Sequence, residues 1–134
     1  MDPDRGFPLF LCATVVLLIG AIVTGLRAKR SMAPHLSFVA GAVVSLWLAI
    51  YFAVLLGDFY DLEPAEPITS IHMLIAKIAT LSFIGPLVTG ALTLRKRTPR
   101  RKRAHLVCAL IAVVLTVAAT VTGAWMLYLA ERLA

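Results

Sequence analysis

Apolar residues fill four long stretches of the chain, and polar residues are concentrated between them. The stretches are residues 7–26, 35–56, 68–94 and 104–130. Each is about as long as, or longer than, the roughly 20 residues that an α-helix needs to cross about 30 Å of hydrocarbon. A strand of a membrane barrel would instead alternate polar and apolar positions over about ten residues. The pattern therefore predicts an all-α integral membrane protein, built as a four-helix bundle.

Composition supports the membrane assignment. The hydrophobic share is 60%, the charged share is 15% and the mean hydropathy is +0.92, whereas about half of an ordinary soluble domain is apolar and about a quarter is charged. Little of the sequence lies outside the apolar stretches, so we expect one transmembrane domain over residues 1–134. No soluble catalytic module is expected. The sequence leaves independent enzymatic activity open, and we expect none.

Charged residues alternate between the loops. Of the 13 Lys and Arg residues, seven lie in residues 95–103, and Arg27, Lys29 and Arg30 follow the first stretch. Short loops rich in Lys and Arg stay cytoplasmic, so both termini and the acidic segment 57–67 are expected on the outer side (N-out/C-out) of a bacterial-type inner membrane. A basic loop beside a membrane pairs more often with lipid headgroups than with nucleic acid. Membrane lipids are therefore the expected partner, and nucleic acid is not.

A histidine and a Thr-Gly pair recur with the same spacing in the last two stretches. His72 leads to Val88-Thr89-Gly90, and His105 leads to Val121-Thr122-Gly123 at the same distance. A third copy, Val23-Thr24-Gly25, ends the first stretch without a histidine at its head. Small residues at these positions are typical of close helix packing. They are equally suited to a flat cofactor lying against a helix, and the sequence leaves both interpretations open.

Two histidines are expected at the same depth in the membrane. His35 and His105 stand at the starts of the second and fourth stretches, which run in the same direction through the bilayer. If these helices face each other, the two imidazoles would be axial ligands of one haem b, with the Lys and Arg residues of the basic loops near its propionates. Histidine is also tolerated at membrane interfaces without any ligand, so a purely structural role is equally open.

The third stretch contains two further polar residues of interest. His72 has only Met73 and Met126 as soft partners, which is too small a set for a copper site. Lys77 is the one charged residue inside a stretch, and either it reaches back to water or its ammonium meets a carboxylate, such as a haem propionate. The pair Gly85-Pro86 predicts a bend in this helix, because proline removes a backbone donor.

Short motifs in this sequence resemble two families of membrane protein. The motifs are Ala33-Pro34-His35, Ile71-His72-Met73-Leu74-Ile75-Ala76, the basic loop into His105, and Val121-Thr122-Gly123-Ala124-Trp125-Met126-Leu127-Tyr128. Together they resemble the small four-helix membrane proteins linked to maturation of haem-copper oxidases, over about residues 27–130. They are also similar to the b-type transmembrane cytochromes, whose histidines on alternate helices hold haem. Two departures stand out: Val39 occupies the place of a usual methionine, and only one complete histidine pair is present.

These patterns and the resemblance lead to one expected function and one alternative. We expect a b-type haem-binding membrane protein that acts in electron transfer or in assembly of a respiratory or other energy-transducing complex, with a larger membrane complex as partner. The candidate cofactor-binding residues are His35, His105, His72 and Lys77, of which His35 and His105 are the metal ligands. The alternative is a cofactor-free accessory subunit that docks through small-residue faces at Gly20, Gly41 and Gly123. A transporter is disfavoured because no acidic residue lies within the stretches.

Overall fold

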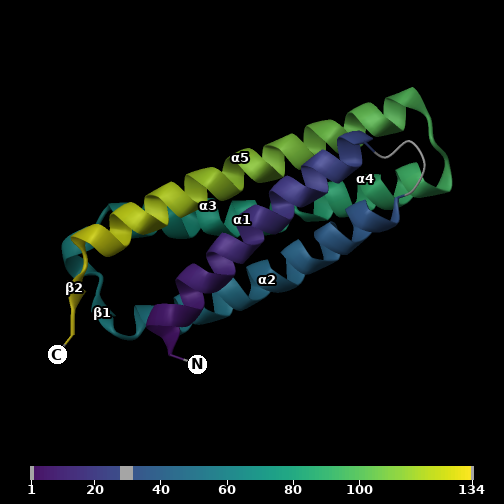
Figure 1. Cartoon of the computed structure of the whole chain (residues 1–134). Helices are drawn as coiled ribbons and strands as arrows, with labels where there is room; N and C mark the ends of the chain where they lie inside the picture. The colour runs from purple at the N-terminus through teal and green to yellow at the C-terminus, as the bar shows by residue number, and fades with distance from the viewer. Residues whose placement is uncertain (1, 28–31, 134) are drawn as a thin grey trace. The chain divides into compact units, whose positions relative to one another are not determined.

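The computed structural model describes residues 2–27 and 32–133, and nearly all of them are helical (Figure 1). The long helices are α1 (Pro3–Arg27), α2 (Ala33–Gly57), α3 (Ile68–Ser82), α4 (Ile84–Arg95) and α5 (Pro99–Leu129). The short elements are β1 (Tyr60–Asp61), the 3-10 turn η1 (Glu63–Ala65) and β2 (Glu131–Arg132). Within the described ranges, four helical segments are long and apolar enough to cross a membrane, with α3 and α4 together forming one of them. The predicted all-α class is confirmed, and so is the prediction of four helical segments that could cross a membrane.

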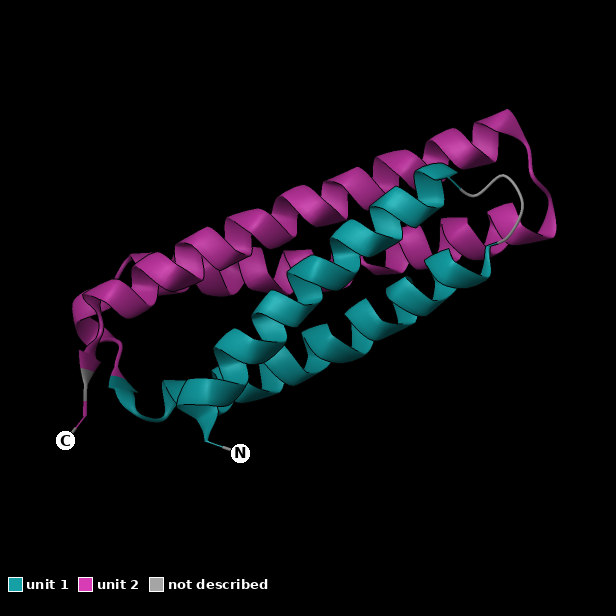
Figure 2. Ribbon diagram, in the orientation of Figure 1, with its two compact units in different colours: residues 1–60 teal, residues 61–134 magenta. Residues whose placement is uncertain are grey.

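The chain divides into two compact units, residues 1–60 and residues 61–134 (Figure 2). Unit 1 is a helical hairpin in which α1 packs along α2, and unit 2 is a hairpin in which α5 packs along both α3 and α4. A basic loop connects the helices at the turn of unit 2, while Lys29 and Arg30, which lie between α1 and α2 in the sequence, are outside the described residues. The assembly of the two hairpins into one four-helix bundle, as a single domain, stays a prediction.

Unit 1 packs aromatic rings of α2 onto glycines of α1. A Cβ atom added to Gly6 would lie 2.6 Å from Cδ1 of Phe52, and one added to Gly20 would lie 2.5 Å from Cδ1 of Phe38. Carbon atoms in ordinary contact are about 3.5–4.0 Å apart, so only glycine allows these rings to lie so close to α1. Phe52 also stacks on Phe10, with ring centroids 5.5 Å apart. The rings and glycines therefore set the spacing of this hairpin.

Two buried hydroxyl groups form hydrogen bonds at the interface between the same helices. Thr14 of α1 and Ser45 of α2 are 1% and 6% exposed. Both donate to the carbonyl of Phe10, at 2.7 Å and 2.9 Å. A hydroxyl buried without a partner costs several kcal/mol in an apolar medium, and a shared acceptor avoids that cost while holding α2 against α1.

The helical segment of unit 2 that precedes the basic turn is interrupted at Phe83, between α3 and α4. Pro86 lies three residues further on and has no backbone N–H, so the carbonyl four residues before it, in Ser82, lacks its usual helical donor. The interruption lies close to Gly85-Pro86, where the sequence predicted a bend. Gly85 faces α5, because a Cβ at this position would lie 3.4 Å from the Cβ of Cys108, at ordinary contact distance.

Candidate functional site: three histidine seats

Each histidine of the chain packs against the glycine of a Val-Thr-Gly motif in the helix next to its own, and His72 and His105 also approach the threonine hydroxyl. We use the term histidine seat for the imidazole, the Thr-Gly pair beneath it and the backbone carbonyl three residues before the threonine. The three seats are His35 with Ala21, Thr24 and Gly25; His105 with Pro86, Thr89 and Gly90; and His72 with Ala119, Thr122 and Gly123. All three copies of the Val-Thr-Gly motif therefore place their glycine beside an imidazole.

The first seat joins α2 to α1 in unit 1. Nδ1 of His35 lies 2.8 Å from the carbonyl oxygen of Ala21. A Cβ added to Gly25 would lie 3.0 Å from Nδ1 and 3.1 Å from Cε1 of the same ring. Thr24 directs its hydroxyl to the carbonyl of Gly20 at 2.6 Å. The Nδ1–Cε1 edge of the imidazole therefore faces α1, over a position that has no side chain.

The second seat joins α5 to α4 at the turn of unit 2. Nδ1 of His105 lies 3.1 Å from the carbonyl oxygen of Pro86 and 3.4 Å from Oγ1 of Thr89. Thr89 donates its own proton to the carbonyl of Gly85 at 2.7 Å. A Cβ on Gly90 would lie 3.3 Å from Cε1 and 3.4 Å from Nδ1. The same ring edge again faces the neighbouring helix.

The third seat joins α3 to α5 at the opposite end of unit 2. Nδ1 of His72 lies 3.2 Å from Oγ1 of Thr122, and the backbone of Ala119 lies close to the ring. Thr122 donates to the carbonyl of Ala118 at 2.8 Å. A Cβ on Gly123 would lie only 2.8 Å from Cε1 of His72, so this seat is the tightest of the three.

These partners decide which ring nitrogen carries the proton when an imidazole is neutral. A backbone carbonyl can only accept a hydrogen bond, so Nδ1 of His35 and of His105 must donate. The hydroxyl of Thr122 has already given its proton to Ala118 and is left to accept from His72. All three rings are therefore held with the proton on Nδ1 and the lone pair on Nε2. Metal-ligating histidines share this arrangement, because a donor bond from one nitrogen fixes the tautomer and directs the other.

The reciprocal pairing in unit 2 follows from a common spacing. His105 and Gly123 are 18 positions apart, as are His72 and Gly90, and 18 residues make five turns of about 3.6 residues each. The histidine and the glycine of each segment therefore share one helix face. Because α5 runs antiparallel to α3 and α4, each histidine meets the glycine of the other segment. At about 1.5 Å per residue the two seats are roughly 27 Å apart, which is close to the thickness of the hydrocarbon layer.

The predicted haem-ligand pair spans the two units. His35 belongs to unit 1 and His105 to unit 2, and each is described within its own hairpin, so their pairing stays a prediction. Lys77 is exposed on α3, and its predicted role in binding a cofactor likewise stays a prediction. In the part of the chain that the structure describes, no three His, Cys, Asp or Glu residues come together to hold a metal ion.

The structure identifies partners that the sequence pattern did not predict. The carbonyl groups of Ala21 and Pro86 accept hydrogen bonds from imidazoles, although neither residue has a polar side chain that would reveal this role. The equal spacing of His72 to Gly90 and of His105 to Gly123 was the available signal for the reciprocal pairs.

Comparisons with protein-family models, curated proteins and solved structures give no match to this chain. The chemistry of the seats therefore carries the functional argument.

Proposed function

We propose that the protein is a b-type haem-binding integral membrane protein that acts in electron transfer or in assembly of a respiratory or other energy-transducing complex. His35 and His105 are the proposed axial ligands. The observation that carries the proposal is the repeated seat, which holds the proton on Nδ1 and leaves the lone pair on Nε2, as an iron ligand requires. A haem with two axial histidines supplies one-electron transfer when bound.

The choice of His35 and His105 rests on chain topology and charge. Each histidine lies shortly after a basic loop, near the start of α2 and of α5. Loops of this composition stay on the cytoplasmic side, so we place both rings at the cytoplasmic ends of their spans in a bacterial-type inner membrane, with both termini outside. His72 is near the start of α3, which follows the acidic loop, and it belongs to the opposite end. It therefore does not compete for the same iron.

The chain's own groups have distinct tasks in this proposal. The carbonyls of Ala21 and Pro86 hold the two rings in one tautomer and so fix the direction of Nε2. Gly25 and Gly90 let the rings lie close to the neighbouring helices, so that the imidazole orientation is fixed by packing. Lys and Arg side chains of the basic loops are suited to neutralise the carboxylates of a haem.

A visible spectrum tests the proposal directly. The protein, purified in detergent after expression with sufficient haem supply, should show the reduced-minus-oxidised bands of a b-type haem. His35→Ala and His105→Ala should each lose most of the bound haem, and His72→Ala is the matched control that should retain it. Far-UV circular dichroism of each variant checks that the helices are intact. Colourless wild-type protein, or a spectrum that survives both His35→Ala and His105→Ala, would refute the proposal.

A cofactor-free accessory subunit is the second candidate, and the seats also give it some support. The hydrogen bond from His35 to Ala21 joins α2 to α1, and the one from His105 to Pro86 joins α5 to α4. Such bonds stabilise helix pairs in a membrane without any ligand. In this case the protein would be colourless and would copurify at fixed stoichiometry with a larger complex. The histidine variants would then lower the stability of the hairpins and change no spectrum.

A further inference from the structure

The turn between α4 and α5 has the highest density of charge in the chain. We call residues 95–103 the basic turn; it contains seven Lys and Arg residues. All of them are exposed except Arg101, which is half-buried. No acidic residue occurs in the sequence between Glu66 and Glu131. The positive charge of the basic turn is therefore not balanced by the two helices that it connects.

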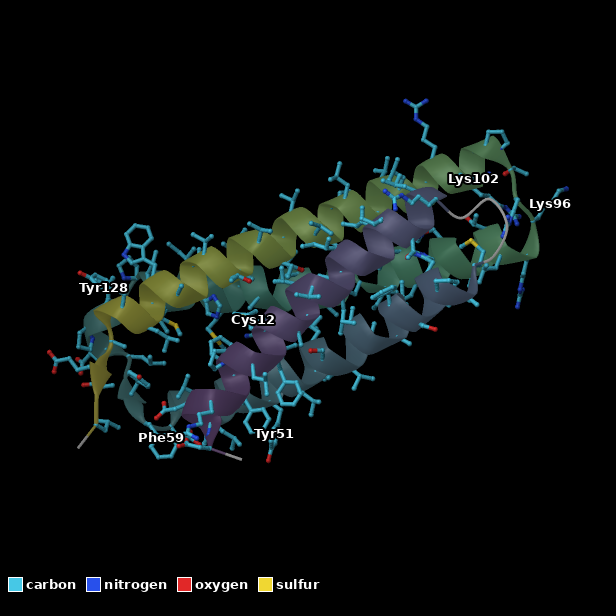
Figure 3. All side chains as sticks on the ribbon, in the orientation of Figure 1. Cys12, Tyr51, Phe59, Lys96, Lys102 and Tyr128 are labelled. Atoms are coloured by element: carbon cyan, nitrogen blue, oxygen red, sulfur yellow. The ribbon has the colours of Figure 1, made fainter. Side chains whose placement is uncertain are left out.

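Hydrogen bonds hold the basic turn in a defined conformation. Thr98 caps α5, because its hydroxyl accepts from the backbone N–H of Arg101 at 3.3 Å and its carbonyl accepts from that of Lys102 at 3.1 Å. The guanidinium of Arg101 donates to the carbonyl of Leu92 at 2.8 Å and so caps the end of α4. Arg101 thus has a structural task. The side chains of Lys96 and Lys102, labelled in Figure 3, extend from this end of the hairpin.

The first turn of α5 is an unfavourable place for so many cations. Arg100, Arg101, Lys102 and Arg103 follow Pro99 at the start of the helix. The N-terminus of a helix carries a partial positive charge that favours anions and disfavours Lys and Arg. The four side chains also repel one another. This conformation is therefore favoured when anions from outside the chain lie against it.

Helix length places the basic turn at the membrane surface. Arg103 and Trp125 are 22 positions apart on α5, which is about 33 Å of helix at about 1.5 Å per residue. Trp125 and Tyr128 are 55% and 86% exposed, as expected for aromatic residues in the interfacial belt. When they lie at one interface, the hydrocarbon of about 30 Å ends close to Arg103 at the other. Arg100, Lys102 and Arg103 then lie within the headgroup layer.

We propose that the basic turn is a binding site for the phosphate groups of anionic phospholipids in the leaflet that surrounds it, with Arg100, Lys102 and Arg103 as the principal contacts. Arginine binds phosphate oxygens with two parallel hydrogen bonds, and lysine adds a point charge. Free phosphate shares this chemistry, but a phospholipid is favoured because its acyl chains can pack against the exposed apolar residues Leu106 and Leu110 that follow on α5. The proposal does not require a bound haem, although the same turn also contains Lys and Arg side chains that are suited to haem carboxylates.

The test compares lipid selectivity in reconstituted membranes. The full-length protein is placed in phosphatidylcholine bilayers that contain trace spin-labelled phosphatidylglycerol or spin-labelled phosphatidylcholine. Electron paramagnetic resonance then measures the fraction of each lipid immobilised by the protein. Each Lys or Arg near an anionic surface contributes about a fivefold preference at most. We expect Arg100→Gln/Lys102→Gln/Arg103→Gln to lower the selectivity for phosphatidylglycerol by about fivefold or more, because the principal phosphate contacts are lost. Four Lys and Arg residues remain in the basic turn, so the membrane topology should be preserved.

Two further variants distinguish a phosphate-binding site at the basic turn from general electrostatic attraction of anionic lipids to the protein. Arg100→Lys/Arg103→Lys keeps the charge and should retain selectivity within about twofold of wild type. Arg5→Gln/Lys77→Gln removes two exposed cations that are not part of residues 95–103 and should also stay within about twofold. The proposal would be overturned if Arg5→Gln/Lys77→Gln lost as much selectivity for phosphatidylglycerol as the triple variant. It would also be overturned if the triple variant kept the selectivity of the wild type. Displacement of labelled lipid by inorganic phosphate, beyond that by chloride at equal ionic strength, would show a site for free phosphate instead. RNA binding of the wild type and the triple variant is measured separately. If the triple variant loses RNA binding but keeps its lipid selectivity, the basic turn is a nucleic-acid surface and the proposal is overturned.

Discussion

Alanine substitution at two equivalent glycines isolates the packing of the histidine seats. A methyl group on Gly123 would place Cβ 2.8 Å from Cε1 and 3.2 Å from Nδ1 of His72, whereas on Gly90 the nearest atoms of His105 are 3.3 Å and 3.4 Å away. The ordinary contact distance is about 3.5–4.0 Å. Gly123→Ala must therefore push the imidazole away, and Gly90→Ala requires a shift of only a few tenths of an ångström.

The expected difference in stability between these variants is large enough to measure. Overpacking at a well-fitted contact costs about 1–3 kcal/mol, and displacing His72 also weakens its hydrogen bond to Thr122, worth about 1 kcal/mol. Replacing glycine by alanine inside a helix contributes about 1 kcal/mol in the other direction, and it does so at both positions. We therefore expect Gly123→Ala to lower the free energy of unfolding by about 1–3 kcal/mol. Gly90→Ala should remain within about 1 kcal/mol of wild type.

Unfolding by sodium dodecyl sulfate in mixed micelles, followed by far-UV circular dichroism, gives both free energies under one condition. A double-mutant cycle then identifies the cause. In a His72→Ala background the clash is absent, so Gly123→Ala should become neutral or stabilising. Equal stability of Gly123→Ala and Gly90→Ala, or the same cost of Gly123→Ala with and without the His72 ring, would refute this account of the seat.

Three other substitutions give independent checks. Gly20→Ala places Cβ 2.5 Å from Cδ1 of Phe38 and should destabilise unit 1 by about 1–3 kcal/mol in the same unfolding assay; a variant as stable as wild type would contradict the ring-on-glycine packing. Thr122→Val keeps the shape but removes the acceptor 3.2 Å from Nδ1 of His72, so it should cost about 1 kcal/mol, and no loss would show that this bond contributes nothing. Pro86→Ala restores a backbone donor for the carbonyl four residues earlier, and hydrogen exchange should show increased protection next to the interruption; unchanged exchange there would mean that another feature causes the break.

The sequence by itself determined the helices of this protein. A helix that crosses lipid must pair its backbone groups internally and must present apolar side chains over the whole hydrocarbon thickness, so the length and content of each apolar stretch were sufficient to locate its span. The interruption near Phe83 was equally local, because it depends on the missing N–H of Pro86. Neither feature needs a contact from elsewhere in the chain.

Only the tertiary structure decided how the recurring motifs are used. His72 and His105 each precede a Val-Thr-Gly motif in their own segment, yet each ring packs on the motif of the other segment, because antiparallel packing brings the start of one helix to the end of its neighbour. The carbonyls of Ala21 and Pro86 became hydrogen-bond acceptors for the same reason. Backbone groups are identical at every position, so their role depends on which side chain the packing brings to them.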